Sequence, residues 1–129
     1  RRGAEVIVSA RSEDKLMALV DELPGRASYQ VLDVQDEDSI RSAVSTVGHV
    51  DGLVYLAGVY WPFGAAEWEA DHAIKMIDVN LTGLVRVLGA VVPSMVKRDA
   101  GHNVQLDGVP GVAQFNWVYG IEGGYHVLG

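Results

Sequence analysis

Apolar and polar positions along the chain follow two periods, one typical of strands and one typical of helices. Short apolar and β-branched runs occupy residues 4–9, 28–34, 51–57 and 101–107, and each run is predicted to be a strand. Between them lie longer segments whose apolar residues recur every three or four positions, as in amphipathic helices. Strands that alternate with helices of this length predict an α/β fold with a parallel sheet and right-handed crossovers.

The first two helices have recognisable ends. The first begins at Ser12, a favourable N-cap residue, and is ended by Pro24 and Gly25. The second opens with the acidic residues 36–38, whose charge suits the positive end of the helix dipole. Its apolar face is expected to consist of Ile40, Ala43, Val44 and Val47.

The third helix is the longest element and is predicted to cover residues 71–98, with a bend near Pro93. After it, the glycines of residues 108–129 interrupt any long element, so this tail is poorly predicted. The chain shows no repeat, low-complexity tract or linker. We therefore expect residues 1–129 to form one domain.

Composition narrows the class of protein. With 49% hydrophobic and 21% charged residues, the 129-residue chain resembles an ordinary globular domain. Its net charge of −7 argues against nucleic-acid binding, because no basic stripe is present to neutralise phosphates. The apolar stretch 84–95 is interrupted by Arg86 and Pro93 and is too short to span a bilayer, so a cytoplasmic protein without membrane contact is expected. The chain has no cysteine and its histidines lack metal-ligand spacing, so no metal site is expected.

The most informative segment leads from the third strand to the long helix. Residues 51–58 read Asp-Gly-Leu-Val-Tyr-Leu-Ala-Gly, an apolar run that ends in small residues. Asn80 then places an amide inside the apolar helix, where burial costs ~1–3 kcal/mol unless its hydrogen bonds are satisfied. These residues resemble the short-chain dehydrogenase/reductase family, which has Asn-Asn-Ala-Gly at the end of its fourth strand and an active-site Asn in the next helix. The resemblance covers roughly residues 3–119 and implies an incomplete, three-layer Rossmann-like sheet flanked by helices.

The resemblance also implies a nicotinamide dinucleotide site. Arg11 stands where the family contacts the adenosine ribose, and an Arg there suits a 2′-phosphate, so NADP is expected in preference to NAD. Asp33 and Val34 match the positions beside the adenine. Ala57 and Gly58 match the backbone that lines the ribose and nicotinamide. Without the resemblance, Arg11 is simply a solvated residue beside a helix start and Asp33 caps a turn.

Carbonyl reduction needs a proton donor, and a Tyr can serve if a nearby cation lowers its pKa from about 10. The family uses Tyr-x-x-x-Lys together with a Ser and the helix Asn. Tyr119 and Asn80 match two members of this set. The Lys position holds Gly123, and the Ser positions hold Asp107 and Gly108. The resemblance thus implies an oxidoreductase that interconverts a ketone and an alcohol, while the missing cation predicts weak or no activity for the chain itself.

Two other departures from the family concern the sheet. Tyr55 and Leu56 replace the two asparagines of the strand-end motif, which is expected to remove a polar staple. The family has a Gly-rich phosphate loop before its first helix, and Arg2 and Gly3 look like the end of that helix. The given sequence therefore does not contain that loop. Residues 117–124 read as a strand with a Gly-x-x-x-Gly turn, and a permuted first strand formed by them is an alternative to a degenerate Tyr-x-x-x-Lys site.

Two classes of function follow. One is a reductase that binds NADP and a small-molecule carbonyl or alcohol. The other is a non-catalytic remnant of the fold that acts as a binding or oligomerisation module. It would use helix 71–98, which in this family commonly packs against its twin in a homo-oligomer.

Overall fold

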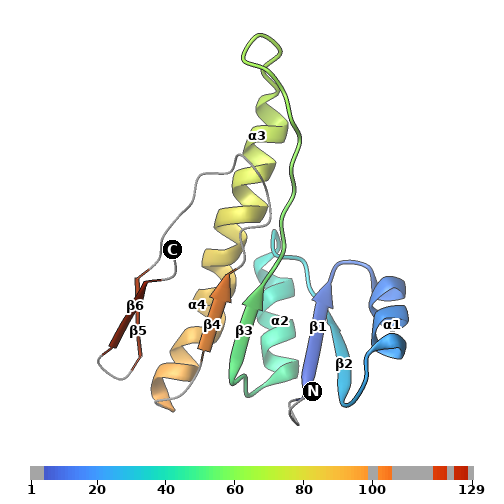
Figure 1. The fold of residues 1–129 in the computed structure, drawn as a ribbon, viewed down its shortest axis with the longest axis vertical. Coiled ribbons are helices and arrows are strands. Elements are labelled where there is room, and N and C mark those ends of the chain that lie inside the picture. The colour runs from blue at the N-terminus through green and yellow to red at the C-terminus, as the bar shows by residue number, and fades with distance from the viewer. Residues whose placement is uncertain (1–4, 99–101, 106–117, 122–123, 128–129) are drawn as a thin grey trace. The chain divides into compact units, whose positions relative to one another are not determined.

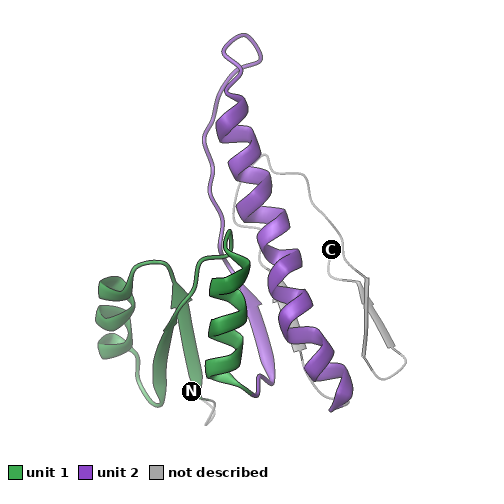
Figure 2. Ribbon diagram, turned by 180° about the vertical axis from the view of Figure 1, so that it is seen from behind, with its two compact units in different colours: residues 1–48 green, residues 49–129 purple. Residues whose placement is uncertain are grey.

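A computed structural model describes residues 5–98, 102–105, 118–121 and 124–127. It divides the chain into two compact units, residues 1–48 and residues 49–129 (Figure 2). Strands and helices alternate in the order that the sequence pattern predicts (Figure 1). The parallel α/β class is confirmed, because the first two strands pair in parallel and the next two do the same.

The first unit is a parallel strand pair with two helices. Its elements in chain order are β1 (Val6–Ala10), α1 (Glu13–Glu22), β2 (Ala27–Val31) and α2 (Glu37–Val47). Val6 lies opposite Ala27 and Ala10 lies opposite Val31. Helix α1 contacts both strands and α2 contacts β2. Ile40 and Ala43, two members of the predicted apolar face of the second helix, are buried here together with Leu16 of α1.

Helix α2 illustrates how local chemistry sets the boundaries. Its N-cap is Asp36, whose carboxylate accepts hydrogen bonds from the backbone N–H groups of Asp38 at 2.9 Å and Ser39 at 3.3 Å. The helix ends at Gly48, whose φ of 73° lies in the region that favours glycine. Ser12 occupies the N-cap of α1 as predicted, but within the described residues its hydroxyl makes no capping bond.

The second unit holds two strand pairs and the longest helical run. Its elements in chain order are β3 (Gly52–Tyr55), α3 (Ala70–Ile77), the π-turn η1 (Asp78–Thr82), α4 (Gly83–Lys97), β4 (His102–Gln105), β5 (Val118–Ile121) and β6 (Gly124–Val127). Strands β3 and β4 are parallel, with Gly52 opposite His102. Helices α3 and α4 join through η1 into one run that passes beside β3 and β4 (Figures 1 and 2).

One face of this run forms the core of the second unit. Its buried side chains are Val79, Leu84, Val87, Val91 and Met95. Their spacing is five residues across the π-turn and three or four residues afterwards, so η1 absorbs the one irregular step. Helix α4 continues through Pro93, which lacks a backbone N–H, and the π-type bonding lies at η1.

The helical run also bears on the membrane expectation. Among the described residues, Ala70–Lys97 is long and apolar enough to cross a membrane, with 28 residues and a mean hydropathy of 1.6 in its most apolar window. The sequence expectation rested on residues 84–95 alone, whereas the structure gives a longer helix. Core helices of soluble proteins meet the same criterion. Inside this helix Asn80 and Arg86 are hydrogen-bonded to groups of the same unit, which favours a packed core helix.

The tail differs from its prediction. The sequence pattern predicted no long element in residues 108–129, whereas β5 and β6 form an antiparallel pair with Val118 opposite Val127. Among the described strands, β5 joins neither of the two parallel pairs. The described strands therefore give no support to residues 117–124 as a permuted strand of the parallel sheet.

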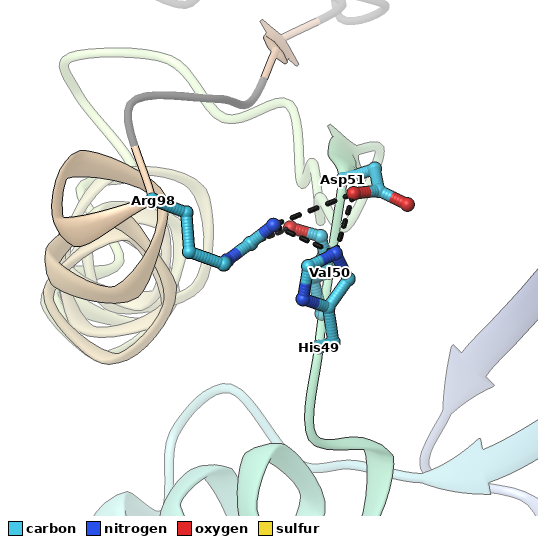
Figure 3. A network of polar contacts seen from close by, with 4 residues as sticks. All are labelled: His49, Val50, Asp51 and Arg98. Atoms are coloured by element: carbon cyan, nitrogen blue, oxygen red, sulfur yellow. Dashed lines mark hydrogen bonds and ion pairs between the residues drawn. The ribbon is translucent and has the colours of Figure 1, made fainter.

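A polar network fastens the start of β3 to the end of α4 (Figure 3). Arg98 donates from Nη2 to the Val50 carbonyl at 2.6 Å, and its Nη1 lies 2.7 Å from His49 Nε2 and 3.4 Å from Asp51 Oδ1. His49 Nε2 also lies 2.7 Å from Asp51 Oδ1. The hydrogen bond from His49, and then its charge, hold the pKa of Asp51 below its usual value. We call residues 49–51 and Arg98 the base network.

Candidate cofactor-binding site

In the first unit, the structure brings two predicted cofactor residues to one edge. Arg11 follows the last residue of β1 and is exposed. The Leu32 N–H donates to the Ala10 carbonyl at 2.9 Å, which extends the parallel ladder one step beyond β2. Arg11 directly follows Ala10 and Asp33 directly follows Leu32, so both lie at the carboxyl edge of this strand pair. Open α/β sheets bind ligands at this edge.

Asp33 has a structural role at this edge. Its Oδ1 accepts a hydrogen bond from the Gln35 N–H at 2.9 Å, and its own N–H donates to the Ser39 hydroxyl at 2.9 Å. The turn reading of Asp33 is therefore confirmed. Val34 follows it in the same turn and is half-buried. These two hydrogen bonds fix the backbone turn that follows β2.

In the second unit, Asn80 is fastened to the segment that follows β3. Its Oδ1 accepts a hydrogen bond from the Val59 N–H at 2.8 Å, and its Nδ2 donates to the Val59 carbonyl at 2.9 Å. The amide is half-buried, and both of its polar atoms have partners, as a buried amide requires. Ala57 and Gly58 lie just before Val59 and are exposed. The prediction that Asn80 faces inward is confirmed.

The end of β3 is attached to the same turn of helix. Tyr55 is buried, with 5% of its surface exposed, and its hydroxyl donates to the Val79 carbonyl at 2.6 Å. The sequence predicted the loss of a polar staple at this position. That prediction concerned a bond between neighbouring strands, and the described contacts show a different one, because the Tyr55 hydroxyl makes a hydrogen bond from the strand end to the helix.

The surroundings of Tyr55 keep its hydroxyl protonated. Burial raises the pKa of Tyr55 to about 12, the Arg86 charge opposes this and the Asp78 charge adds to it. Arg86 Nη1 and Asp78 Oδ1 are 3.0 Å apart and their side chains are 24% and 27% exposed. This partly buried ion pair lies close enough to act on the hydroxyl, which remains a donor at neutral pH.

Other predicted catalytic residues are only partly placed. Tyr119 lies in β5 opposite His126, and only its backbone is described. Asp107, Gly108 and Gly123 lie outside the described residues. The structure thus brings Asn80 to Val59, which directly follows Ala57 and Gly58, and the position of the Tyr119 hydroxyl stays a prediction.

Sequence reasoning missed the bond of Tyr55 and the pair of Asp78 and Arg86. A signal for the first was present, since a Tyr that ends a buried apolar strand needs a partner for its hydroxyl. The partner itself was not predictable, because it is the Val79 carbonyl, which the π-turn frees from its usual helical hydrogen bond. The loop also contacts helix α3 through an aromatic pair. Trp61 stacks on His72 with ring centroids 4.7 Å apart.

Comparison with known proteins gives the context for this geometry. Residues 1–119 match the family model described as short chain dehydrogenase. The chain is 34% identical over 119 residues to 3-oxoacyl-[acyl-carrier-protein] reductase from Thermotoga maritima, covering 87% of this chain and 48% of that protein. It is 30% identical over 129 residues to NADP-dependent 3-hydroxy acid dehydrogenase from Shigella flexneri, covering 92% of this chain and 48% of that protein.

Solved structures agree with the sequence relatives. Serine dehydrogenase from Escherichia coli superposes with a TM-score of 0.75 at 31% identity, covering 81% of this chain and 50% of that chain. A closed form of serine dehydrogenase complexed with NADP+ gives the same TM-score of 0.75. The chain spans about half the length of the curated relatives it matches. The family match, the Rossmann-like neighbours and the Asn80 anchor together show that the chain belongs to the short-chain dehydrogenase/reductase family.

Proposed function

We propose that the protein is an NADP-dependent oxidoreductase that interconverts a small-molecule ketone and alcohol in the cytoplasm. The observation that carries the proposal is the double hydrogen bond of Asn80 to Val59. It holds the exposed backbone of Ala57 and Gly58, whose small side chains leave room for a ribose and nicotinamide. Bound NADP would supply the hydride chemistry, and residues 57–59 would orient it. Relatives in the same family include an NADP-dependent enzyme, which supports this choice.

The preference for NADP rests on the edge of the first unit. Arg11 is exposed beside Asp33 at the carboxyl edge of β1 and β2, where a guanidinium suits a 2′-phosphate. Neither Ser9 nor Ala10 offers the carboxylate that a free 2′-hydroxyl favours. Arg11 is therefore proposed to select the phosphorylated cofactor, and Asp33 and Val34 to lie beside the adenine.

A fluorescence titration with NADPH and NADH tests this proposal. The wild-type chain should bind NADPH more tightly, and Arg11→Ala should weaken NADPH binding by roughly 10–100-fold, since a hydrogen bond to a charged group contributes ~1.5–3 kcal/mol. Arg26→Ala is the matched control, because Arg26 precedes β2 at the opposite edge, where its carbonyl accepts from the Val6 N–H. Tighter binding of NADH by the wild-type chain would remove Arg11 from the site.

Catalysis by the 129-residue chain alone is expected to be weak or absent. Tyr119 is the proposed proton donor, but the position four residues later is Gly123 in place of a Lys. Without a neighbouring cation the Tyr is a poor acid at neutral pH, and general acid catalysis typically contributes ~10²–10⁴-fold. Rapid NADPH-dependent reduction of a simple ketone, abolished by Tyr119→Phe, would contradict this expectation.

A second candidate function is assembly through the long helix, either in the enzyme or in a non-catalytic remnant. Exposed apolar residues lie three, eight and eleven positions apart along one stripe of the helix: Ile74, Ile77, Val85 and Val96. Such a stripe suits a second copy of the chain, and no nucleic acid or membrane is proposed as a partner. Val96→Asp should shift the mass measured by light scattering from dimer to monomer. Ser94→Asp, on the opposite face of α4 and also exposed, should not.

A further inference from the structure

The end of β3 and the π-turn are joined by a contact that the family motif does not contain. Tyr55 stands at the first Asn position of the Asn-Asn-Ala-Gly pattern. Its ring is buried and its hydroxyl donates to the Val79 carbonyl at 2.6 Å. The bond therefore connects the last residue of the strand to the residue that precedes Asn80.

The π-turn explains why the Val79 carbonyl needs this partner. In a regular α-helix the Gly83 N–H would bond to the carbonyl four residues earlier, which is that of Val79. Here the Gly83 N–H donates to the Asp78 carbonyl, five residues earlier. A buried carbonyl that loses its helical partner costs free energy unless another donor replaces it. The Tyr55 hydroxyl supplies that donor.

Two consecutive helix residues thus hold both ends of one short segment. Val79 binds Tyr55, and Asn80 binds Val59 through two hydrogen bonds. We call these contacts the π-turn anchors. Between them lie residues 56–58, which are exposed, with Leu56 at 65%. An exposed segment fixed at both ends has less conformational freedom to lose when it binds a ligand.

The surroundings of the Tyr55 hydroxyl indicate that it positions backbone and does not take part in a proton transfer. Asp78 and Arg86 form their ion pair across the π-turn, at 3.0 Å, and both act on the Tyr55 hydroxyl. The hydroxyl donates to a carbonyl inside the unit and lies on a buried side chain. Tyr55 therefore acts on a bound ligand through the backbone that it holds.

We propose that Tyr55 is a positioning residue that fixes the π-turn, and through Asn80 the cofactor-lining backbone of residues 56–58. The proposal rests on the function proposed above for Ala57 and Gly58. In this chain the hydrogen bond from Tyr55 to the helix stands where the family motif has an Asn. Removal of the Tyr55 hydroxyl should loosen residues 56–59 without unfolding the first unit.

Amide hydrogen exchange of Tyr55→Phe tests the proposal without any cofactor. The Val59 amide, bonded to Asn80, should exchange roughly 3–10-fold faster in this variant, because a net hydrogen bond contributes about 0.5–1.5 kcal/mol. The Leu32 amide, bonded to Ala10 in the first unit, is the internal reference and should not change. Tyr60→Phe, at an exposed Tyr of the same loop, is the matched control and should leave both rates unchanged. An unchanged Val59 rate in Tyr55→Phe, or equal acceleration of both amides, would overturn the proposal.

If Tyr55→Phe does not fold, the hydroxyl proton of Tyr55 in the wild-type chain can be observed by nuclear magnetic resonance instead. A buried, hydrogen-bonded hydroxyl should give a slowly exchanging proton resonance with a nuclear Overhauser contact to Val79 or Asn80. Failure to detect that contact, with the other Tyr55 resonances assigned, would overturn the proposal.

NADPH titration separates this proposal from the proposed function. Tyr55→Phe should weaken NADPH binding by about three- to tenfold and Tyr60→Phe should not. Equal affinities of wild type and Tyr55→Phe would overturn the link to the cofactor. A wild-type chain that binds no NADPH would overturn the proposed function itself, and the exchange rates would then decide alone whether Tyr55 positions the turn.

Discussion

Strand β3 is attached to the long helical run at both of its ends, and the two attachments use different chemistry. At its start, the base network joins charged and polar side chains to Arg98, and the Asp51 side chain is 84% exposed (Figure 3). At its end, the π-turn anchors are neutral hydrogen bonds that involve a buried Tyr and a half-buried Asn. Two of the predicted cofactor residues, Ala57 and Gly58, follow this second end.

The comparison shows which attachment can fix a binding segment. Exposed ion pairs contribute ~0–1 kcal/mol and are screened by salt. A buried polar group that loses its partner costs about 1–3 kcal/mol, because water cannot replace the missing bond. The π-turn anchors should therefore hold their segment more firmly than the base network holds the start of the strand.

The largest effect is expected for Asn80→Ala. The change removes both bonds to Val59 and should lower the free energy of unfolding by about 2 kcal/mol. Asn80→Asp is the matched variant: it keeps an acceptor for the Val59 N–H but sets a carboxylate oxygen against the Val59 carbonyl, so it should also lose stability at neutral pH and recover part of it at low pH, where the protonated carboxyl can donate. Chemical denaturation measures both. A loss no greater than that of Arg98→Ala would break the comparison.

Tyr55 should leave a signature at alkaline pH. Its pKa is raised from 10.0 to about 12 by burial, so the folded state keeps a proton that the unfolded state releases. Stability from this group is fully present below pH 10 and is lost as the pH rises from 10 toward 12. Denaturation of wild type and Tyr55→Phe over this range should show a decline in wild type that the variant lacks. Parallel declines would mean that the hydroxyl is not held.

Loss of the base network should lower the free energy of unfolding only slightly, and the size of this effect should depend on the salt concentration. Arg98→Ala should cost about 1 kcal/mol at low ionic strength, and less in 1 M salt, because the His49 and Asp51 side chains that it contacts are exposed, and only its bond to the carbonyl of the half-buried Val50 should resist salt. The same salt change should leave the cost of Tyr55→Phe unaltered, since that hydrogen bond is neutral. Melting curves of the two variants at two salt concentrations make the comparison.

The smallest effect concerns Asp51. Its pKa is lowered by the hydrogen bond with His49, so its contribution is present above the usual value of 3.8 and disappears as the pH falls through the lowered folded value. Asp51→Asn should slightly reduce the fall in the free energy of unfolding at acidic pH, and Asp21→Asn on α1 should leave that fall unchanged. A fall that is the same in wild type and Asp51→Asn would show that the base network contributes nothing to stability.

The sequence predicted the fold well where periodicity carries the information. The strands around Val6, Val31, Val54 and Val104 all occur, as two parallel pairs, and the long helix lies within one residue of its predicted ends. Asn80 was identified because an amide in an apolar helix requires partners. These features depend on local pattern and on simple burial costs.

The remaining features depend on contacts between distant residues. The π-turn at Asp78–Thr82 cannot be read from the sequence around it, because its freed carbonyl is satisfied by Tyr55, 24 positions away. The pairing of β5 with β6 likewise escaped a reading based on glycine content. The Tyr55–Val79 bond and the β5–β6 pair, which the sequence pattern did not predict, both depend on hydrogen bonds between distant segments or strands.

A nuclear magnetic resonance titration of the isotope-labelled chain with NADPH can show whether residues 57–59 line the cofactor. We expect saturable shifts of the amide resonances of Ala57, Gly58 and Val59 together with those beside Arg11. These residues lie at the carboxyl ends of β3 and β1. Shifts confined to other residues, such as those of the base network, or no saturable shift at all, would contradict this expectation.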